Sequence, residues 1–165
     1  MERETPELER FKEEVIERIR GRWTPVQLRE EPIFRAYRDF FWRISIDPTK
    51  VRPAAEALIR RVLRESPIPK INTLVDAYNL ASMETGIALA AFDMDRIGEA
   101  LLMREAREGE QFLGIGMEKP LTLNGGEIVV EDGKKLIAVY PYRDAEHSKV
   151  TLQTRRVLML VCGVP

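Results

Sequence analysis

Three polar side chains with amide or carboxyl groups recur at helical spacing. Asn72, Asp76 and Asn79 stand at positions i, i+4 and i+7, so a helix places all three on one face. Elsewhere the chain fills expected helix surfaces with Glu and Arg, which are better helix formers than Asn and Asp. The stripe therefore predicts a ligand-facing pocket wall, with a buried hydrogen-bond network and a plain polar surface as the alternatives.

A basic run precedes this helix and is suited to binding phosphate. Residues 35–64 contain eight Lys or Arg but three Asp or Glu, although the whole chain has a net charge of −1. Such a run attracts the backbone of RNA. The expected RNA-binding side chains are Arg52, Arg60, Arg61 and Arg64. A solvated helix surface is the alternative interpretation.

The remaining reactive residues exclude several chemistries. One Cys cannot form an internal disulfide, and one Cys with one His cannot build an ordinary zinc site, so we expect no metal. Cys162 lies in an apolar run, which favours a buried, unreactive thiol over a catalytic partner for His147. Spacing alone does not identify an acid–base pair among the acidic candidates, which are Glu108, Glu110, Glu127, Asp132 and Asp144.

Length and composition indicate one globular domain. The chain has 165 residues, of which 44% are hydrophobic and 32% charged. The near-neutral net charge excludes a uniformly basic nucleic-acid-binding protein, and no apolar run is long enough for a transmembrane helix. The N-terminus lacks the apolar segment of a secretory signal, so we expect a cytoplasmic protein without a membrane partner. The abundance of Arg and Glu over Lys and Gln hints at a thermophile.

The elements that must position these residues are helices first and strands second. Helices are expected from Thr5 to Gly21 and over residues 32–45, 53–65 and 71–83, the last stopping near Gly86. Strands are expected over residues 87–92, 100–104, 111–116, 127–131, 136–140 and 157–161, with a hairpin at Asp132-Gly133. This order predicts an α+β fold over a repeated βαβ fold. The apolar last strand should be covered by another chain, unless the sequence is a shortened form.

Several motifs together resemble the B3/B4 domain of the phenylalanyl-tRNA synthetase β subunit. The first group is Asn72-x-x-Val75-Asp76-x-x-Asn79, Glu84-x-Gly86 and Ala91-Phe92-Asp93-x-Asp95-Arg96-Ile97. The second is Arg104-x-Ala106-x-x-Gly109-Glu110, Ile137-Ala138 and Ser148-x-Val150-Thr151-x-x-Thr154. The similarity covers roughly residues 47–161. We therefore expect a freestanding B3/B4-like domain over residues 47–165, preceded by a helical extension over residues 1–46.

The resemblance implies an α+β fold in which a mixed β-sheet is flanked by helices. It also implies a cleft that in the synthetase hydrolyses tyrosine wrongly attached to the phenylalanine tRNA, without a metal or an organic cofactor. This chain departs from the bacterial pattern at three positions. Ala90 stands in place of an editing His, Leu160 in place of a Glu that reads the tyrosine hydroxyl, and Asp144-Ala145 in place of a Gly-Gly turn.

Three hypotheses follow from these expectations. The first hypothesis is an aminoacyl-tRNA deacylase acting in trans, and the second is a non-catalytic tRNA-binding module. The third is a protein that binds a free amino acid or a similar small molecule. For the deacylase, the resemblance suggests Asn72, Asp76, Asn79, Ala90, Arg104 and Leu160 as substrate-binding residues. Asn72, Asn79 and Arg104 would donate hydrogen bonds, and Glu110 or Asp144 would order the attacking water. The sequence leaves the oligomeric state open.

Overall fold

The computed structural model describes residues 1–165 and confirms the α+β class. Five α-helices come first, namely α1 (Pro6–Arg22), α2 (Pro25–Glu30), α3 (Pro32–Arg43), α4 (Ala54–Leu63) and α5 (Thr73–Thr85). The strands follow as β1 (Ala88–Asp93), β2 (Leu102–Glu105), β3 (Gln111–Phe112), β4 (Leu121–Thr122), β5 (Ile128–Glu131), β6 (Leu136–Tyr140), β7 (Arg143–Asp144) and β8 (Val157–Cys162). A short 3₁₀ helix, η1 (Glu146–Ser148), lies between β7 and β8.

Local capping determines where the first and last helices begin and end. The Thr5 side chain accepts a hydrogen bond from the Leu8 N–H at the start of α1, as the sequence predicts. Gly21 does not end that helix, because the chain continues helically to Arg22. At the end of α5, Gly86 adopts the left-handed conformation with φ of 75°, as expected for a glycine that terminates a helix.

The strands form three small antiparallel sheets rather than the single mixed sheet expected. β1 pairs with β8, β3 pairs with β4, and the largest sheet has the order β2-β5-β6-β7. Every pairing is antiparallel. Parallel neighbours need a long crossover connection, usually a helix, whereas here all the α-helices precede the strands and β5 turns directly into β6 at Asp132-Gly133. The predicted hairpin at that turn is confirmed.

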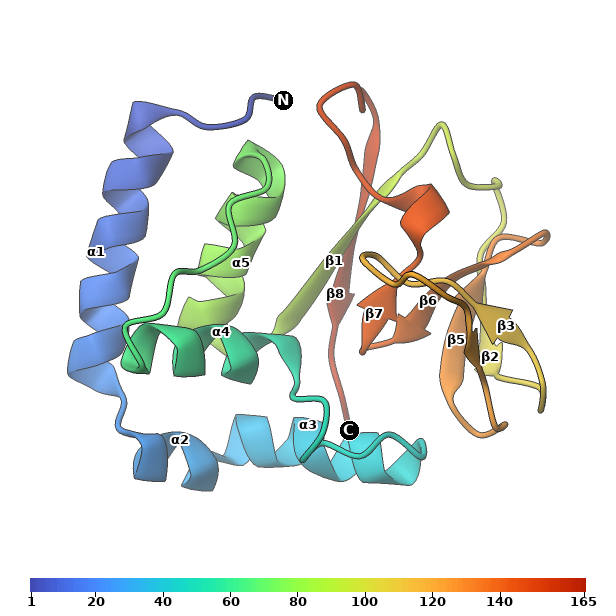
Figure 1. The fold of residues 1–165 in the computed structure, drawn as a ribbon, viewed down its shortest axis with the longest axis horizontal. Helices are drawn as coiled ribbons and strands as arrows, with labels where there is room; N and C mark the ends of the chain where they lie inside the picture. Colours follow the sequence, from blue (N-terminus) through green and yellow to red (C-terminus); the bar gives the residue numbers. More distant parts are fainter.

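The helices and the larger sheet lie on opposite sides of the β1–β8 pair. In Figure 1, α1, α4 and α5 stand on one side and β2, β5 and β6 on the other, with α3 running below both. Ile19, Ile59 and Leu80 belong to the core of the helical side. Ala90, Phe92 and Ile137 are packed in a second cluster between the two groups of strands. β1 is therefore largely buried, whereas Met159 and Val161 on β8 stay exposed.

A tyrosine hydroxyl joins α3 to the β1–β8 pair. The Tyr37 hydroxyl accepts a hydrogen bond from the Ala88 N–H at 3.0 Å and donates one to the carbonyl oxygen of Cys162. Ala88 and Cys162 are opposite one another in the register, so the hydroxyl bridges the two strands at this end. The buried Tyr37 thereby fixes the strand pair that carries Ala90 and Leu160. None of the helices combines the length and hydropathy that a membrane-spanning segment requires.

Candidate functional site

A pocket of about 180 Å³ lies between α5, the β1–β8 pair and the end of the larger sheet. It is lined by Ala54, Tyr78, Asn79, residues 88–90, residues 138–144, Leu160 and Cys162, and we call it the Asp144 pocket. Eleven of these fifteen lining residues are hydrophobic. Its volume is below the ~300–1,000 Å³ of typical drug-sized ligand sites, so it suits a small apolar group.

Ala90 and Leu160, where the resemblance predicts the loss of two polar side chains, lie together in this pocket. Ala90 on β1 is directly opposite Leu160 on β8 in the strand register, and both side chains line the pocket. Ala90 is 5% exposed. This wall of the pocket therefore offers methyl groups and no hydrogen-bonding side chain.

Asp144 gives the pocket its acidic group. Burial raises the pKa of the Asp144 carboxyl from 3.8 to about 7, because desolvation disfavours the charged carboxylate. No neighbouring hydrogen bond or positive charge offsets that effect. The residue as a whole is half-buried, and it lines the pocket. A carboxyl group poised near neutrality in a cleft is a candidate for proton transfer.

Three further groups surround Asp144. Burial raises the pKa of the Tyr78 hydroxyl, and the nearby charges of Asp144 and Asp76 raise it further, so the phenol stays protonated and can donate a hydrogen bond. Burial, assisted by Asp144, raises the pKa of the Cys162 thiol to about 12, which leaves it unreactive. The half-buried Asn79 side chain lines the pocket and adds an amide.

The other two members of the predicted polar stripe have structural partners. The Asn72 side chain accepts a hydrogen bond from the Val75 N–H at 3.0 Å and caps the start of α5. One carboxylate oxygen of the buried Asp76 accepts a hydrogen bond from the Ile71 N–H at 2.9 Å. Helical spacing put the three side chains on one face, but only Asn79 lies far enough along α5 to line the pocket. A substrate-binding role for the stripe stays a prediction, and Asn79 is the member placed to fulfil it.

Arg104 and Glu110 lie outside the Asp144 pocket and bind each other. The Arg104 guanidinium contacts both oxygens of Glu110, at 2.6 and 2.9 Å, and also Glu131 at 2.6 Å. These contacts hold the pKa of Glu110 at about 2, well below its usual value. Such a carboxylate is a weak base, so the geometry does not favour Glu110 as the residue that orders water.

The predicted RNA-binding arginines are partly engaged within the protein. Glu56 on α4 is fully buried and forms ion pairs with Arg38 at 2.8 Å, Arg60 at 2.8 Å and Arg52 at 3.6 Å. Arg61 donates a hydrogen bond to the Pro67 carbonyl at 2.9 Å. Arg61 forms no ion pair, and neither does the exposed Arg64, which directly follows the end of α4. RNA binding by this run stays a prediction, and the buried Glu56 gives two of the arginines a structural partner.

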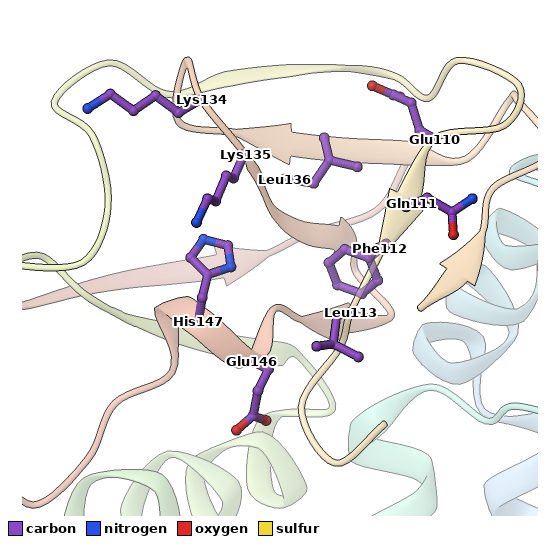
Figure 2. Close-up of a pocket in the computed structure, with 9 residues that line it drawn as sticks. All are labelled: Glu110, Gln111, Phe112, Leu113, Lys134, Lys135, Leu136, Glu146 and His147. Carbon is purple, nitrogen blue, oxygen red and sulfur yellow. The ribbon is translucent and has the colours of Figure 1, made fainter. Parts of the chain in front are cut away.

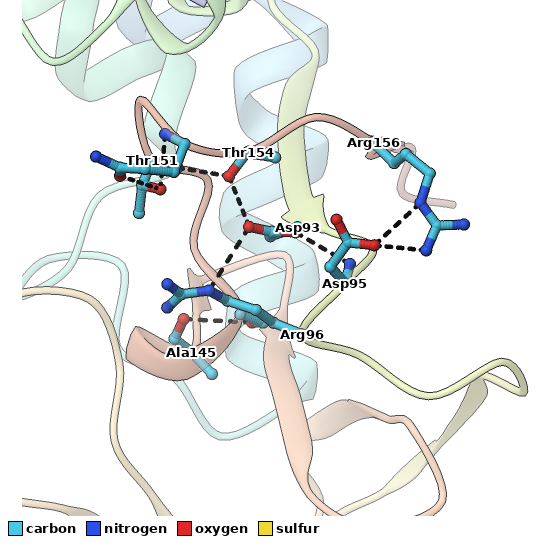
Figure 3. Close-up of polar contacts among 9 residues, drawn as sticks. Asp93, Asp95, Arg96, Ala145, Thr151, Thr154 and Arg156 are labelled. Carbon is cyan, nitrogen blue, oxygen red and sulfur yellow. Dashed lines mark hydrogen bonds and ion pairs between the residues drawn. The ribbon is translucent and has the colours of Figure 1, made fainter.

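The motif that follows β1 forms a structural network. Asp93 is 4% exposed and accepts a hydrogen bond from the Thr154 hydroxyl at 2.7 Å and another from the Asp95 N–H at 3.0 Å (Figure 3). Asp95 in turn contacts Arg156 at 3.0 Å. These bonds tie the end of β1 to the segment that leads into β8. These side chains therefore have a structural role here, and none of them lines the Asp144 pocket.

Sequence reasoning did not identify several residues that line the Asp144 pocket. Tyr78, Tyr140 and Arg143 reach it from α5, β6 and β7. Tyr78 precedes Asn79 directly, so the polar stripe pointed to the correct turn of α5 without including it. Arg143 lies on a strand of two residues, which is too short to leave a pattern in the sequence. No group of three or more His, Cys, Asp or Glu side chains in the structure is arranged to hold a metal ion.

The sequence of the chain matches a known protein family and several known proteins. The family model described as the B3/4 domain matches residues 36–165, beginning within α3. The chain is 34% identical over 109 residues to a phenylalanine–tRNA ligase β subunit from Yersinia pestis, which covers 66% of this chain but 14% of that protein. It is 32% identical over 103 residues to the corresponding subunit from Chromobacterium violaceum, covering 62% of this chain and 13% of that protein.

A solved structure is also similar. It is an N-terminal fragment of the phenylalanyl-tRNA synthetase β subunit from Pyrococcus horikoshii, with a TM-score of 0.46 and 12% identity, covering 88% of this chain and 65% of that one.

The chain spans about one-seventh of the length of the two β subunits from Yersinia pestis and Chromobacterium violaceum. The boundary expected at residue 47 stays a prediction.

Proposed function

The chain belongs to the B3/4 domain family, and from this premise we propose that it binds the aminoacyl end of a charged tRNA in the Asp144 pocket and hydrolyses the ester in trans. One observation carries the proposal. A small apolar pocket contains a single carboxyl group whose pKa is raised to about 7. Such a group can take up and release a proton near neutral pH, as hydrolysis of an ester requires. The relatives named phenylalanine–tRNA ligase β subunits connect the family with charged tRNA.

The proposed reaction assigns one proton transfer to Asp144. The ionised carboxylate accepts a proton from a water molecule whose oxygen attacks the aminoacyl carbonyl carbon. The ester carbon–oxygen bond then breaks, and the departing ribose oxygen takes the proton back from Asp144. The products are the free amino acid and the uncharged tRNA. Tyr78 and Asn79 supply hydrogen-bond donors at the same pocket for the oxyanion that develops during attack.

The wall formed by Ala90 and Leu160 sets the proposed specificity. A tyrosyl hydroxyl placed against this wall would lose its hydrogen bonds to water without gaining a partner. That loss costs about 1–3 kcal/mol, which corresponds to a factor of roughly 5–150 in rate or affinity. Small or wholly apolar aminoacyl groups should therefore be preferred over tyrosyl groups.

The volume of the Asp144 pocket also suits a free amino acid, which keeps the small-molecule hypothesis as a second candidate. A deacylase releases amino acid from charged tRNA, whereas a binding protein is stabilised against heat by its ligand and shows no turnover. A non-catalytic module would shift tRNA in a gel without releasing amino acid.

The test of catalysis is a pair of matched substitutions. Asp144→Asn keeps the shape of the side chain but removes the group that accepts the proton, so hydrolysis should fall by about 10²–10⁴-fold. Asp39→Asn makes the same chemical change on the exposed surface of α3 and should leave the rate unchanged. The rate of the unaltered protein should rise with pH through about 7, as Asp144 ionises. Equal rates for the two variants would overturn the assignment of Asp144.

A further inference from the structure

The outer edge of β8 pairs with no other strand of the protein, since β8 is bonded to β1 alone. Just beyond that pair, the Arg156 carbonyl oxygen accepts a hydrogen bond from the Met94 N–H at 3.0 Å. Hydrogen-bonded positions alternate along an antiparallel ladder, so the backbone groups of Val157, Met159 and Val161 point away from β1. None of the backbone hydrogen bonds made outside the helices and strand ladders involves these three residues. The edge therefore presents a row of free N–H and C=O groups.

The side chains along this edge are apolar. β8 has the sequence Val-Leu-Met-Leu-Val-Cys, with no charged residue, no proline and no break in its register with β1. Met159 and Val161 are exposed on one face of the strand. Leu158 and Leu160 alternate with them and line, on the other face, a groove of about 160 Å³ whose lining residues are all hydrophobic. Proteins usually protect an edge strand with charges, prolines or bulges, so an unprotected edge is a site for pairing with another chain.

Charged side chains mark other exposed strands and turns of the protein. β2, at one edge of the larger sheet, ends in Arg104 and Glu105. The turn between β5 and β6 carries Lys134 and Lys135, which line the cleft of about 440 Å³ shown in Figure 2 together with Glu146. Charges of this kind oppose the pairing of strand edges. The absence of charge from β8 is therefore a local property of that strand.

We propose that the outer edge of β8 binds β8 of a second copy of this chain, so that the protein forms a symmetric dimer. The strands run antiparallel, and Met159 lies opposite Met159 of the second copy, on the twofold axis. Val157 then lies opposite Val161 of the second copy, and Val161 opposite its Val157. All three outward-pointing residues occupy hydrogen-bonded positions, which gives about six backbone hydrogen bonds between the copies. Two marginal two-stranded pairs thereby become one larger sheet.

The charges beside β8 favour this antiparallel orientation. The nearest charged residues in the sequence, Arg155 and Arg156, both precede the strand. In the proposed register they lie opposite Gly163 and Cys162 of the second copy, so no like charges face each other. A parallel arrangement would place the arginines of the two copies side by side, which is unfavourable.

The apolar surface beside β8 is large enough for a specific interface. The side chains that form it are each 40–64% exposed, and they are Met94, Leu101, Met103, Met159 and Val161. The first three lie beside the Leu158 side of β8, in the groove and the cavity that adjoins it. Together they expose roughly 500 Å² per copy, at the upper end of what a monomer leaves uncovered. Two copies would bury on the order of 1,000 Å², the size at which a contact becomes specific.

The first test is the mass of the full chain in sedimentation equilibrium over about 1–100 μM protein. The unaltered protein should approach twice the 19.0 kDa of one chain. Met159→Lys places two ammonium groups opposite each other on the axis, so the dissociation constant of the dimer should rise at least about tenfold. The control is Val26→Lys, which alters an exposed apolar residue of α2 and should leave the dissociation constant unchanged.

A charge exchange tests the proposed register. Met159→Glu alone should weaken the dimer as Met159→Lys does, because two carboxylates then meet on the axis. An equimolar mixture of the two variants should recover the dimer, since the introduced lysine of one copy lies opposite the introduced glutamate of the other. Recovery is specific to a register centred on Met159, because other registers separate the two introduced charges.

Hydrogen exchange of the unaltered protein decides the inference even if the variants fail to fold. The amide protons of Val157, Met159 and Val161 should exchange more slowly as the protein concentration rises, because pairing protects them. A monomer at every concentration, a dimer that withstands both substitutions of Met159, or exchange at these amides that does not depend on concentration would overturn the proposal.

Discussion

Replacing Asp144 by Asn should stabilise the protein above neutral pH while it removes the proposed base. The pKa of this carboxyl is 3.8 in the absence of burial and about 7 in the folded protein. A difference of about three pKa units at about 1.4 kcal/mol per unit gives a ceiling of about 4 kcal/mol for the cost of ionising the folded site. Because the residue as a whole is only half-buried, we discount this ceiling for solvent screening and expect a gain of about 1–4 kcal/mol.

The pH dependence of this gain follows from the direction of the shift. Between about pH 4 and pH 7 the folded protein holds a proton on Asp144 that the unfolded chain has released. The free energy of unfolding of the unaltered protein therefore loses about 1.4 kcal/mol per pH unit at most across that window, and the loss stops above pH 7. The pKa of His147 is lowered by burial, which gives an effect of opposite sign, but the effect is common to both proteins and cancels in their difference.

The assay is urea unfolding at pH 5, 6, 7 and 8, followed by circular dichroism. The difference between Asp144→Asn and the unaltered protein should be smallest at pH 5, grow to pH 7 and then stay constant. Asp39→Asn should show no such trend, since its carboxyl is exposed. A difference that does not vary with pH, or a variant that is less stable at pH 8, would refute the burial argument.

Three further predictions concern other groups in the structure. Arg60→Gln should lower the free energy of unfolding by about 1–3 kcal/mol in urea, because it leaves the buried Glu56 with fewer partners, whereas Arg64→Gln should change it by less than about 0.5 kcal/mol. Asn72→Ala should cost about 1 kcal/mol through loss of the α5 cap, while Asn79→Ala should barely alter the melting temperature but should raise the KM for substrate. A larger loss of stability from Asn79→Ala would mean that this side chain is structural. The Cys162 thiol, with a pKa of about 12, should resist iodoacetamide at pH 8 in the folded protein and react once urea unfolds it, so rapid labelling without urea would contradict its burial.

The elements with local signals could be predicted from sequence. The α5 helix follows from its apolar pattern and the terminating Gly86, and the β5–β6 hairpin follows from Asp132-Gly133. The elements that were missed are short. α2 has six residues and β4 and β7 have two each, so none of them is long enough to show a period.

The candidate site was harder to predict because its properties arise from distant contacts. Asp144 has an ordinary sequence context, and its raised pKa comes from enclosure by elements far away along the chain, such as α5 and β8. The charge count of the basic run predicts RNA binding or a solvated surface, because nothing in the sequence reveals that Glu56 is fully buried beneath Arg52 and Arg60. Side-chain spacing identified the face of α5 but not which member of the stripe caps the helix and which lines a pocket.

In the proposed function, the Asp144 pocket hydrolyses the ester of an aminoacyl-tRNA and disfavours a buried hydroxyl. The direct measurement is the rate of amino acid release from tRNAs charged with tyrosine, phenylalanine and a small aliphatic residue, with the unaltered protein and with Asp144→Asn. We predict faster release of the apolar amino acids than of tyrosine, by a factor of roughly 5–150, and loss of release in the variant. Release of tyrosine as the fastest of the three would contradict the specificity argued from Ala90 and Leu160, and no release from any of them would contradict the catalytic function itself.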